Sequence, residues 1–103
     1  MKNLQIYNQI ITLKQLLLVD GFIIDGIFGS YAREEETEDS DVDILYHLED
    51  NFYKKYNGFS GFKKLDEIKK MISKSLNKSI DLAPKTNLSK TAKKYILSEV
   101  VYV

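Results

Sequence analysis

The sequence predicts an α/β domain with a mixed sheet of about four strands flanked by helices. Segments whose apolar residues recur at helical spacing alternate with short runs of β-branched and aromatic residues, the order expected of an α/β fold. The connections between these runs are long enough for crossovers, which parallel strands require. With 103 residues, of which 44% are apolar, the chain can bury one modest core. We therefore expect a single domain over residues 1–103.

The first part of the chain predicts a helix followed by a buried strand. Apolar residues recur at helical spacing over residues 3–18, and the pattern stops at the turn signal Asp20-Gly21. Residues 22–28 then form a run rich in isoleucine and phenylalanine, which is typical of a buried strand. A helix that packs on a strand is the expected result.

A short helix, a loop and a second strand are expected next. Ser30 is a good N-cap for a short helix over residues 31–35, and residues 37–40 read as a loop. Residues 41–46 alternate strictly between two faces, with Asp41, Asp43 and Leu45 on one of them. This pattern predicts a strand with a polar start and an apolar body.

The second half repeats the alternation of helix and strand. Its one proline, Pro84, can donate no ladder hydrogen bond and is expected to end the third strand. The expected elements are a connection over residues 49–61, an amphipathic helix over 62–77, a strand over 79–82, a helix over 88–97 and a last strand over 99–103.

Charge is divided unevenly between the two halves, although the net charge is zero. Residues 1–50 carry 3 basic and 11 acidic side chains, whereas residues 51–103 carry 12 basic and 4 acidic ones. Two interpretations stay open: the lysines form the solvated face of a helix, or they dock RNA or an acidic protein. The aromatic residues are not interleaved regularly with basic ones, so direct binding of nucleic acid is not expected.

Composition also limits where the protein is expected to act. No apolar run approaches the roughly 20 residues of a membrane span, and the N-terminal segment lacks the pattern of a signal peptide. The chain has no cysteine, so it has neither a disulfide framework nor a thiolate metal site. These features predict a cytoplasmic protein without a membrane partner.

Two aspartates at strand spacing are the first candidate for chemistry. Asp41 and Asp43 lie on one face of the expected strand, roughly 6–7 Å apart at Cα. Two carboxylates this close repel each other unless a cation lies between them. Magnesium fits, because it takes one or two carboxylates and completes its shell with phosphate oxygens and water.

The dipeptide Gly29-Ser30 is the candidate for binding phosphate. Glycine permits close approach of the backbone, and exposed N–H groups together with a serine hydroxyl can donate hydrogen bonds to phosphate oxygens. Arg33 follows three residues later and could bind the same phosphate through its guanidinium. A Gly-Ser pair alone is also a common turn, so its interpretation depends on the carboxylates nearby.

A calcium loop is the main alternative for the acidic segment. Asp39, Asp41 and Asp43 match its first three acidic positions. The sixth position requires glycine but holds Ile44, and the twelfth holds Asp50 instead of glutamate. This mismatch disfavours calcium.

The motifs together resemble those of the minimal nucleotidyltransferases in the DNA polymerase β-like superfamily. The signature is similar over 29–33, at Glu35 and over 40–45, and residues 80–82 resemble the strand that carries the third carboxylate of these enzymes, here Asp81. One departure is Glu34, where such proteins often have glycine. The added negative charge near the phosphate site can weaken the binding of ATP.

The resemblance implies a polymerase β-like nucleotidyltransferase fold and a mechanism with two magnesium ions. Asp41 and Asp43 would hold both ions, of which one is shared with the triphosphate of ATP and the other is also held by Asp81. Catalytic residues would thus be Asp41, Asp43 and Asp81, and the nucleotide would be bound by Gly29, Ser30 and Arg33. For Asp81, an ordinary acid at a strand end remains the alternative.

The short chain has no room for the helical domain with which larger relatives bind their acceptor. The resemblance therefore extends to antitoxins that transfer AMP from ATP to a tyrosine of a HEPN-domain ribonuclease toxin, in a hetero-oligomeric complex. Two alternatives stay open. One is an antitoxin that neutralises its partner by binding alone, and the other is a subunit of a small-molecule nucleotidyltransferase of the aminoglycoside type.

Overall fold

A four-stranded mixed sheet forms the centre of the structure, a computed structural model that describes residues 3–103. Its strands lie in the order β3-β2-β1-β4. β2 and β3 are parallel, whereas β1 is antiparallel to both β2 and β4. This arrangement confirms the predicted mixed sheet. The strands are β1 (Phe22–Phe28), β2 (Val42–Leu48), β3 (Ile80–Pro84) and β4 (Val101–Tyr102).

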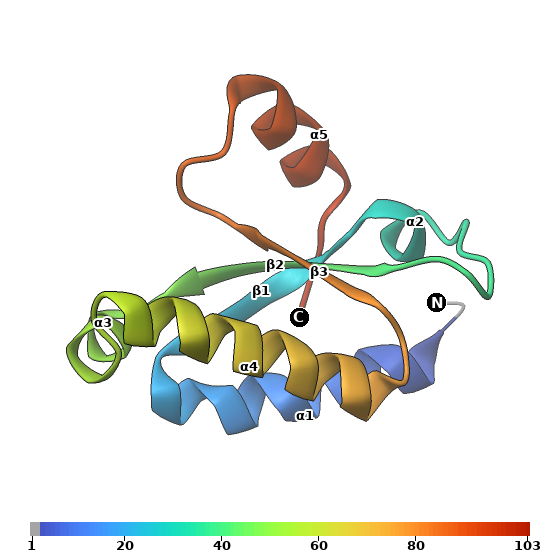
Figure 1. The fold of residues 1–103 in the computed structure, drawn as a ribbon. Helices are drawn as coiled ribbons and strands as arrows, with labels where there is room; N and C mark the ends of the chain where they lie inside the picture. Colours follow the sequence, from blue (N-terminus) through green and yellow to red (C-terminus); the bar gives the residue numbers. More distant parts are fainter. Residues whose placement is uncertain (1–2) are drawn as a thin grey trace.

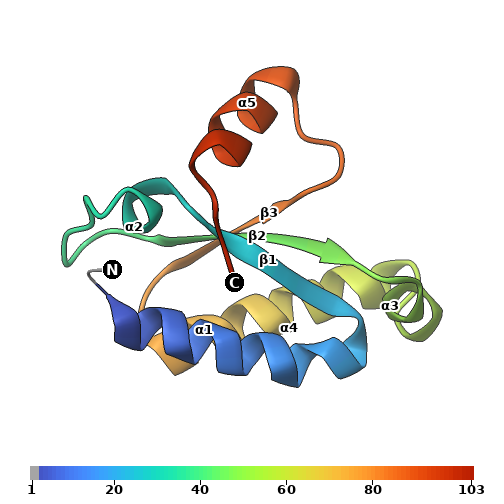
Figure 2. The same ribbon diagram turned by 180° about the vertical axis from the view of Figure 1, so that it is seen from behind.

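The helices leave the two faces of the sheet unequally covered. The two long helices lie side by side on one face, and the last helix stands off the opposite face, as both ribbon views show (Figures 1 and 2). Short helices lie at the two ends of the sheet (Figure 1). The helices are α1 (Leu4–Leu17), continued by the 3₁₀ turn η1 (Leu18–Asp20), α2 (Gly29–Ala32), α3 (Asp50–Lys55), α4 (Phe59–Leu76) and α5 (Lys90–Glu99).

The hydrophobic core lies between the sheet and the pair α1 and α4. Alternate residues of the strands point into it, as the period of two in a strand requires. The helices contribute residues three or four positions apart, which lie on one helix face. Fully buried members include Ile10 of α1, Phe22, Ile24 and Ile27 of β1, Val42 and Ile44 of β2, and Ile72 of α4.

A β-bulge bends β1 near its middle. Ile24 pairs with Tyr46 and Gly26 with Leu45, so Asp25 is the extra residue. The carboxylate of Asp25 lies 2.8 Å from Nδ1 of His47. The bulge shifts the face to which the later residues of β1 point and so aims the strand end toward the turn that follows.

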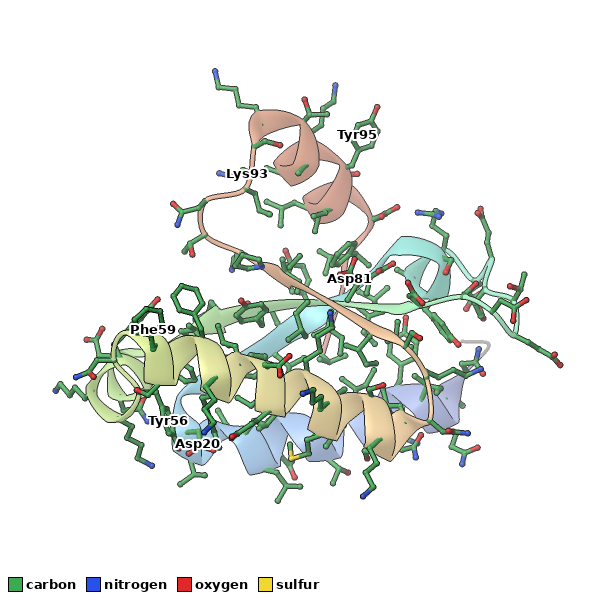
Figure 3. All side chains as sticks on the ribbon, in the orientation of Figure 1. Asp20, Tyr56, Phe59, Asp81, Lys93 and Tyr95 are labelled. Atoms are coloured by element: carbon green, nitrogen blue, oxygen red, sulfur yellow. The ribbon has the colours of Figure 1, made fainter. Side chains whose placement is uncertain are left out.

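The end of the sheet near α3 is tied together by Asp20. The hydroxyl of Tyr56 donates a hydrogen bond of 3.0 Å to Asp20, and the ammonium groups of Lys55 and Lys64 lie 3.7 and 3.6 Å from the same carboxylate. Figure 3 shows Asp20 and Tyr56 together at this end, far from Asp81. These contacts connect α3 and α4 to the end of α1.

Several boundaries differ from the prediction. β2 begins at Val42, so Asp41 directly precedes the strand, and it continues to Leu48. Pro84 is the last residue of β3, which it can be because β3 is an edge strand. α5 begins two residues later than expected, since the hydroxyl of Ser89 accepts a hydrogen bond from the N–H of Ala92 and caps the helix.

Two further differences concern turns. Ser30 is not an N-cap, because α2 already begins at Gly29 and ends at Ala32. Residues 49–61, expected as a connection, contain α3 and the first turn of α4.

Burial of Phe52 explains why residues 50–55 form a helix. The ring of this side chain lies 5.2 Å from that of Tyr56, centroid to centroid. Within residues 3–103 no helix is long and apolar enough to cross a membrane.

Candidate active site

Two predicted carboxylates lie on neighbouring parallel strands. Asp43 of β2 and Asp81 of β3 are register partners, so their Cα atoms are separated by about one strand spacing, roughly 4.8 Å. Asp41 directly precedes β2 and lies near enough to Asp43 for its negative charge to raise the pKa of that carboxyl, after the larger effects of burial and of Asp81. Figure 3 shows Asp81 on the side of the sheet toward α5. The structure thus brings all three aspartates to one edge of the sheet.

Asp43 is the electrostatic centre of this group. Its pKa is raised from 3.8 to about 6, first by partial burial and then by the negative charges of Asp81, Asp41 and Glu99, while Arg33 opposes the shift. The side chain of Asp41 is exposed, as is that of Asp81. The excess of negative charge is therefore concentrated where a cation would be stabilised most.

The turn after β1 lies directly against Asp43. Phe28, the last residue of β1, pairs with Asp43, so Gly29 is placed beside that carboxylate. Gly29 has a φ of 74°, and a Cβ atom on it would overlap the Asp43 carboxylate. No other residue type combines this backbone conformation with this close contact.

The turn is held by its own backbone. The N–H of Arg33 donates to the carbonyl of Gly29, and the N–H of Glu35 donates to that of Ser30. Tyr31 packs into the core with 3% of its surface exposed. Glu34 has a φ of 59°, in the left-handed region that favours glycine. The backbone at this position thus favours the glycine that the family resemblance led us to expect there.

Glu99, the last residue of α5, is a part of the site that the sequence did not predict. One oxygen of its carboxylate accepts a hydrogen bond of 3.0 Å from the N–H of Gly29. The other lies 2.8 Å from Nη1 of Arg33. Glu35 also contacts this guanidinium, at 3.3 Å from Nε. The hydrogen bond that Arg33 donates to Glu99, and secondarily the one that it donates to Glu35, raises the pKa of Arg33.

The position of Glu99 could not be inferred from local pattern. It is 66 residues from Arg33 in the sequence and sits in a segment without any motif. The pattern predicted Glu99 as the first residue of the last strand, whereas the structure makes it the last residue of α5. Among the residues predicted to bind the nucleotide, Gly29 and Arg33 both contact Glu99, whereas Ser30 follows in the same turn.

The donor set suits magnesium better than a metal held by protein alone. Within residues 3–103, no three histidine, cysteine or acidic side chains are grouped as a ready-made metal site. Magnesium needs only one or two carboxylates, because water and substrate phosphates supply its remaining oxygen ligands. Asp41, Asp43 and Asp81 offer hard oxygen donors, and the pKa of Asp43 is raised first by burial and then by neighbouring negative charges, whose repulsion a divalent cation would relieve.

The arrangement provides the elements of phosphoryl-type chemistry. Carboxylates for a cation, a glycine turn with a backbone donor, and a guanidinium lie at the same edge of the sheet. A cation held by these carboxylates, together with the guanidinium and the backbone donor, could bind a polyphosphate, and the side chain of Asp81 is exposed to solvent. A reaction in which a hydroxyl displaces pyrophosphate from a nucleotide matches these groups.

Comparison with protein families gives a match over most of the chain. The model of the family described as "Nucleotidyltransferase domain" matches residues 13–103. The protein adenylyltransferase MntA of Thermococcus cleftensis is 38% identical over 78 residues, which cover 76% of this chain and 71% of that protein. A Methanocaldococcus jannaschii protein assigned as a protein adenylyltransferase is 34% identical over 106 residues and is matched over 100% of both chains.

Solved structures share the fold. A structure assigned as a minimal nucleotidyltransferase superimposes with a TM-score of 0.74 at 21% identity, covering 100% of this chain and 97% of the other. A toxin–antitoxin structure with AMP-PNP superimposes with a TM-score of 0.66 at 20% identity, covering 92% of this chain and 69% of the other. The mixed sheet with its helices is thus the fold of a minimal nucleotidyltransferase.

Proposed function

The chain belongs to the nucleotidyltransferase domain family and is a nucleotidyltransferase, and from this premise we propose that it transfers AMP from ATP to a tyrosine hydroxyl of a HEPN-domain ribonuclease toxin. The transfer would neutralise the toxin, so the protein would act as an antitoxin in a complex with it. The cytoplasm is the proposed compartment.

One observation carries the proposal of catalysis. Asp43 and Asp81 are register partners, and Gly29 lies against Asp43, so the carboxylates and the turn that we propose to bind phosphate share one edge of the sheet. Two relatives that this chain matches over more than two thirds of their length bear the name protein adenylyltransferase, which supports a protein as the acceptor.

In the proposed reaction Asp41, Asp43 and Asp81 hold magnesium, which supplies neutralisation of the charge that develops on the phosphates. The N–H of Gly29, the hydroxyl of Ser30 and the guanidinium of Arg33 bind and orient the triphosphate. The acceptor oxygen attacks the α-phosphorus, the bond from that phosphorus to the bridging oxygen breaks, and pyrophosphate leaves. In this proposal Asp81 accepts the hydroxyl proton.

Mass spectrometry of the acceptor tests this function. The purified protein, ATP, magnesium and a HEPN protein encoded beside its gene are incubated, and the HEPN protein is weighed intact. An added AMP, mapped to tyrosine by fragmentation, is the expected result. A HEPN protein of unchanged mass would contradict the proposal.

A second candidate function is neutralisation by binding alone. It is favoured by Arg33, whose guanidinium already contacts two carboxylates, Glu99 and Glu35. The double variant Asp41→Asn with Asp43→Asn distinguishes the two functions. Loss of neutralisation while the complex still forms supports catalysis, whereas full neutralisation by the double variant supports binding alone.

A further inference from the structure

The carboxylate of Glu99 occupies two of the groups assigned to the nucleotide. Its two oxygens lie 3.0 Å from the N of Gly29 and 2.8 Å from Nη1 of Arg33. A triphosphate cannot bind to these donors while a carboxylate occupies them, because the negatively charged oxygens of the two groups would repel each other. We propose that Glu99 is an internal competitor of the triphosphate and sets the affinity for the nucleotide, an inference that rests on the proposed function.

The charge balance of the site supports displacement. The negative charges of Asp41, Asp81 and Glu99 all act on Asp43, and Arg33 is the cation that opposes them. A bound triphosphate adds several negative charges to this edge of the sheet. If Glu99 moves away from Arg33, the guanidinium becomes available to the phosphates. The same movement removes one negative carboxylate from the neighbourhood of the phosphates.

The turn does not depend on Glu99 for its shape. Its own backbone hydrogen bonds, from Arg33 to Gly29 and from Glu35 to Ser30, close it, and Tyr31 anchors it in the core. Pairing of β1 with β2 holds the residue before it. Glu99 can therefore leave without loss of the donor geometry, which is what a competitor requires and a structural clamp does not.

The element that carries Glu99 is lightly attached. α5 contributes no buried residue, and Tyr95 on it is 67% exposed. Figure 3 shows Lys93 and Tyr95 on α5, away from the sheet. The strand that follows, β4, pairs with β1 over only two residues. Movement of Glu99 thus disrupts little of the core.

Binding experiments with variants of Glu99 test the inference. The dissociation constants of inorganic triphosphate and ATP, each with magnesium, are measured by calorimetry for the wild type and for Glu99→Gln. If Glu99 occupies its donors for about nine-tenths of the time, its removal tightens binding about tenfold. Adenosine, which has no phosphate, is expected to bind equally to both proteins.

Two control variants separate this effect from general charge. Glu35→Gln removes the other carboxylate at Arg33 but leaves the bond to Gly29, and a smaller gain is expected. Glu67→Gln removes one negative charge from α4, on the other face of the sheet, and no change is expected. Equal gains in Glu99→Gln and Glu67→Gln would contradict competition at the donors.

The remaining outcomes are also decisive. Unchanged or weaker triphosphate binding in Glu99→Gln would overturn the inference and assign Glu99 a supporting role. If Glu99→Gln does not fold, Glu99→Asp replaces it, because aspartate keeps the charge but is too short to span both donors; tighter binding supports competition and weaker binding overturns it. Absence of triphosphate binding in every protein, the wild type included, would instead contradict the proposed nucleotide site.

Discussion

The carboxylate of Asp43 occupies the space that a side chain on Gly29 would need. The two residues belong to different elements, and pairing of Phe28 with Asp43 brings them together. The absence of a side chain on Gly29 therefore determines how closely the turn can approach the carboxylates, and this closeness can be tested by mutation.

Gly29→Ala is expected to lower AMP transfer by about 100-fold, because the turn and Asp43 must separate by about 1 Å or more. The left-handed backbone adds a cost of about 1–3 kcal/mol to the free energy of folding. Gly58→Ala is the matched control. Gly58 also has a positive φ, of 58°, but a Cβ there meets no atom within 4 Å, so stability falls while transfer persists. Equal transfer by both variants would refute the role of the close contact.

Glu34→Gly is expected to stabilise the fold by about 0.5–1 kcal/mol, because glycine adopts the φ of 59° without steric cost. Urea unfolding of both proteins gives the difference in free energy. Glu34→Ala serves as control, since it removes the charge but keeps a Cβ in the left-handed region. A gain in Glu34→Ala as large as that in Glu34→Gly would assign the effect to charge.

Asp43→Asn is expected to abolish AMP transfer and to stabilise the metal-free protein at neutral pH. The pKa of Asp43 is higher in the folded chain, about 6, than its ordinary 3.8, so ionisation disfavours the folded state. The loss of folding stability caused by ionisation of Asp43 is absent below about pH 4, grows as the pH rises through about 6, and is constant at higher pH. Because solvent screens this partly exposed group, we expect Asp43→Asn to raise the free energy of unfolding at neutral pH by about 1 kcal/mol.

Thermal unfolding in a chelator at pH 3.5 and pH 7.5 checks this sign. The midpoint of Asp43→Asn should exceed that of the wild type at pH 7.5 only. Added magnesium should stabilise the wild type more than the variant, since binding to the folded state alone raises stability. A lower midpoint for the variant at pH 7.5 would show that the Asp43 charge is already compensated in the metal-free protein.

Asp81→Asn is expected to reduce the turnover number for AMP transfer by at least about 100-fold while the KM for ATP changes little. The reason is that Asp41 and Asp43 remain to hold the ion shared with the triphosphate, whereas the acceptor loses its proton-accepting group. Steady-state kinetics with varied ATP separate the two parameters. A large increase in KM with an unchanged turnover number would instead place Asp81 in nucleotide binding.

The sequence was sufficient to predict the elements that have a strong local pattern. The run at 22–28 predicted β1 with its observed bounds, and the alternation after Asp41 placed Asp41 and Asp43 on one face. The register that sets Asp81 beside Asp43 depends on long-range pairing, so the sequence offered it only by resemblance. The roles of these residues in catalysis remain predictions.

Other features have no local signature. Glu99 reaches Gly29 and Arg33 only because β4 returns the end of the chain to β1. Serine is a residue type that is common at N-caps, but α2 already begins at Gly29, which has a left-handed φ. Ser30 therefore lies inside the helix and does not cap it. α3 was not predicted because its six residues are too few for periodicity, and burial of Phe52 determines it instead.

If Asp43 and Asp81 carry the proposed reaction, the crossover through α3 and α4 makes formation of the active site a late event in folding. Asp43 and Asp81 lie 38 positions apart in the sequence, and only the completed parallel pair of β2 and β3 sets them abreast. Pairing between strands that are distant in sequence forms slowly compared with helices and hairpins. A partly folded chain therefore does not yet hold Asp43 and Asp81 side by side. On the same proposal, a chain in which β2 and β3 are not paired would not turn over nucleotide, and turnover would report that this pair has formed.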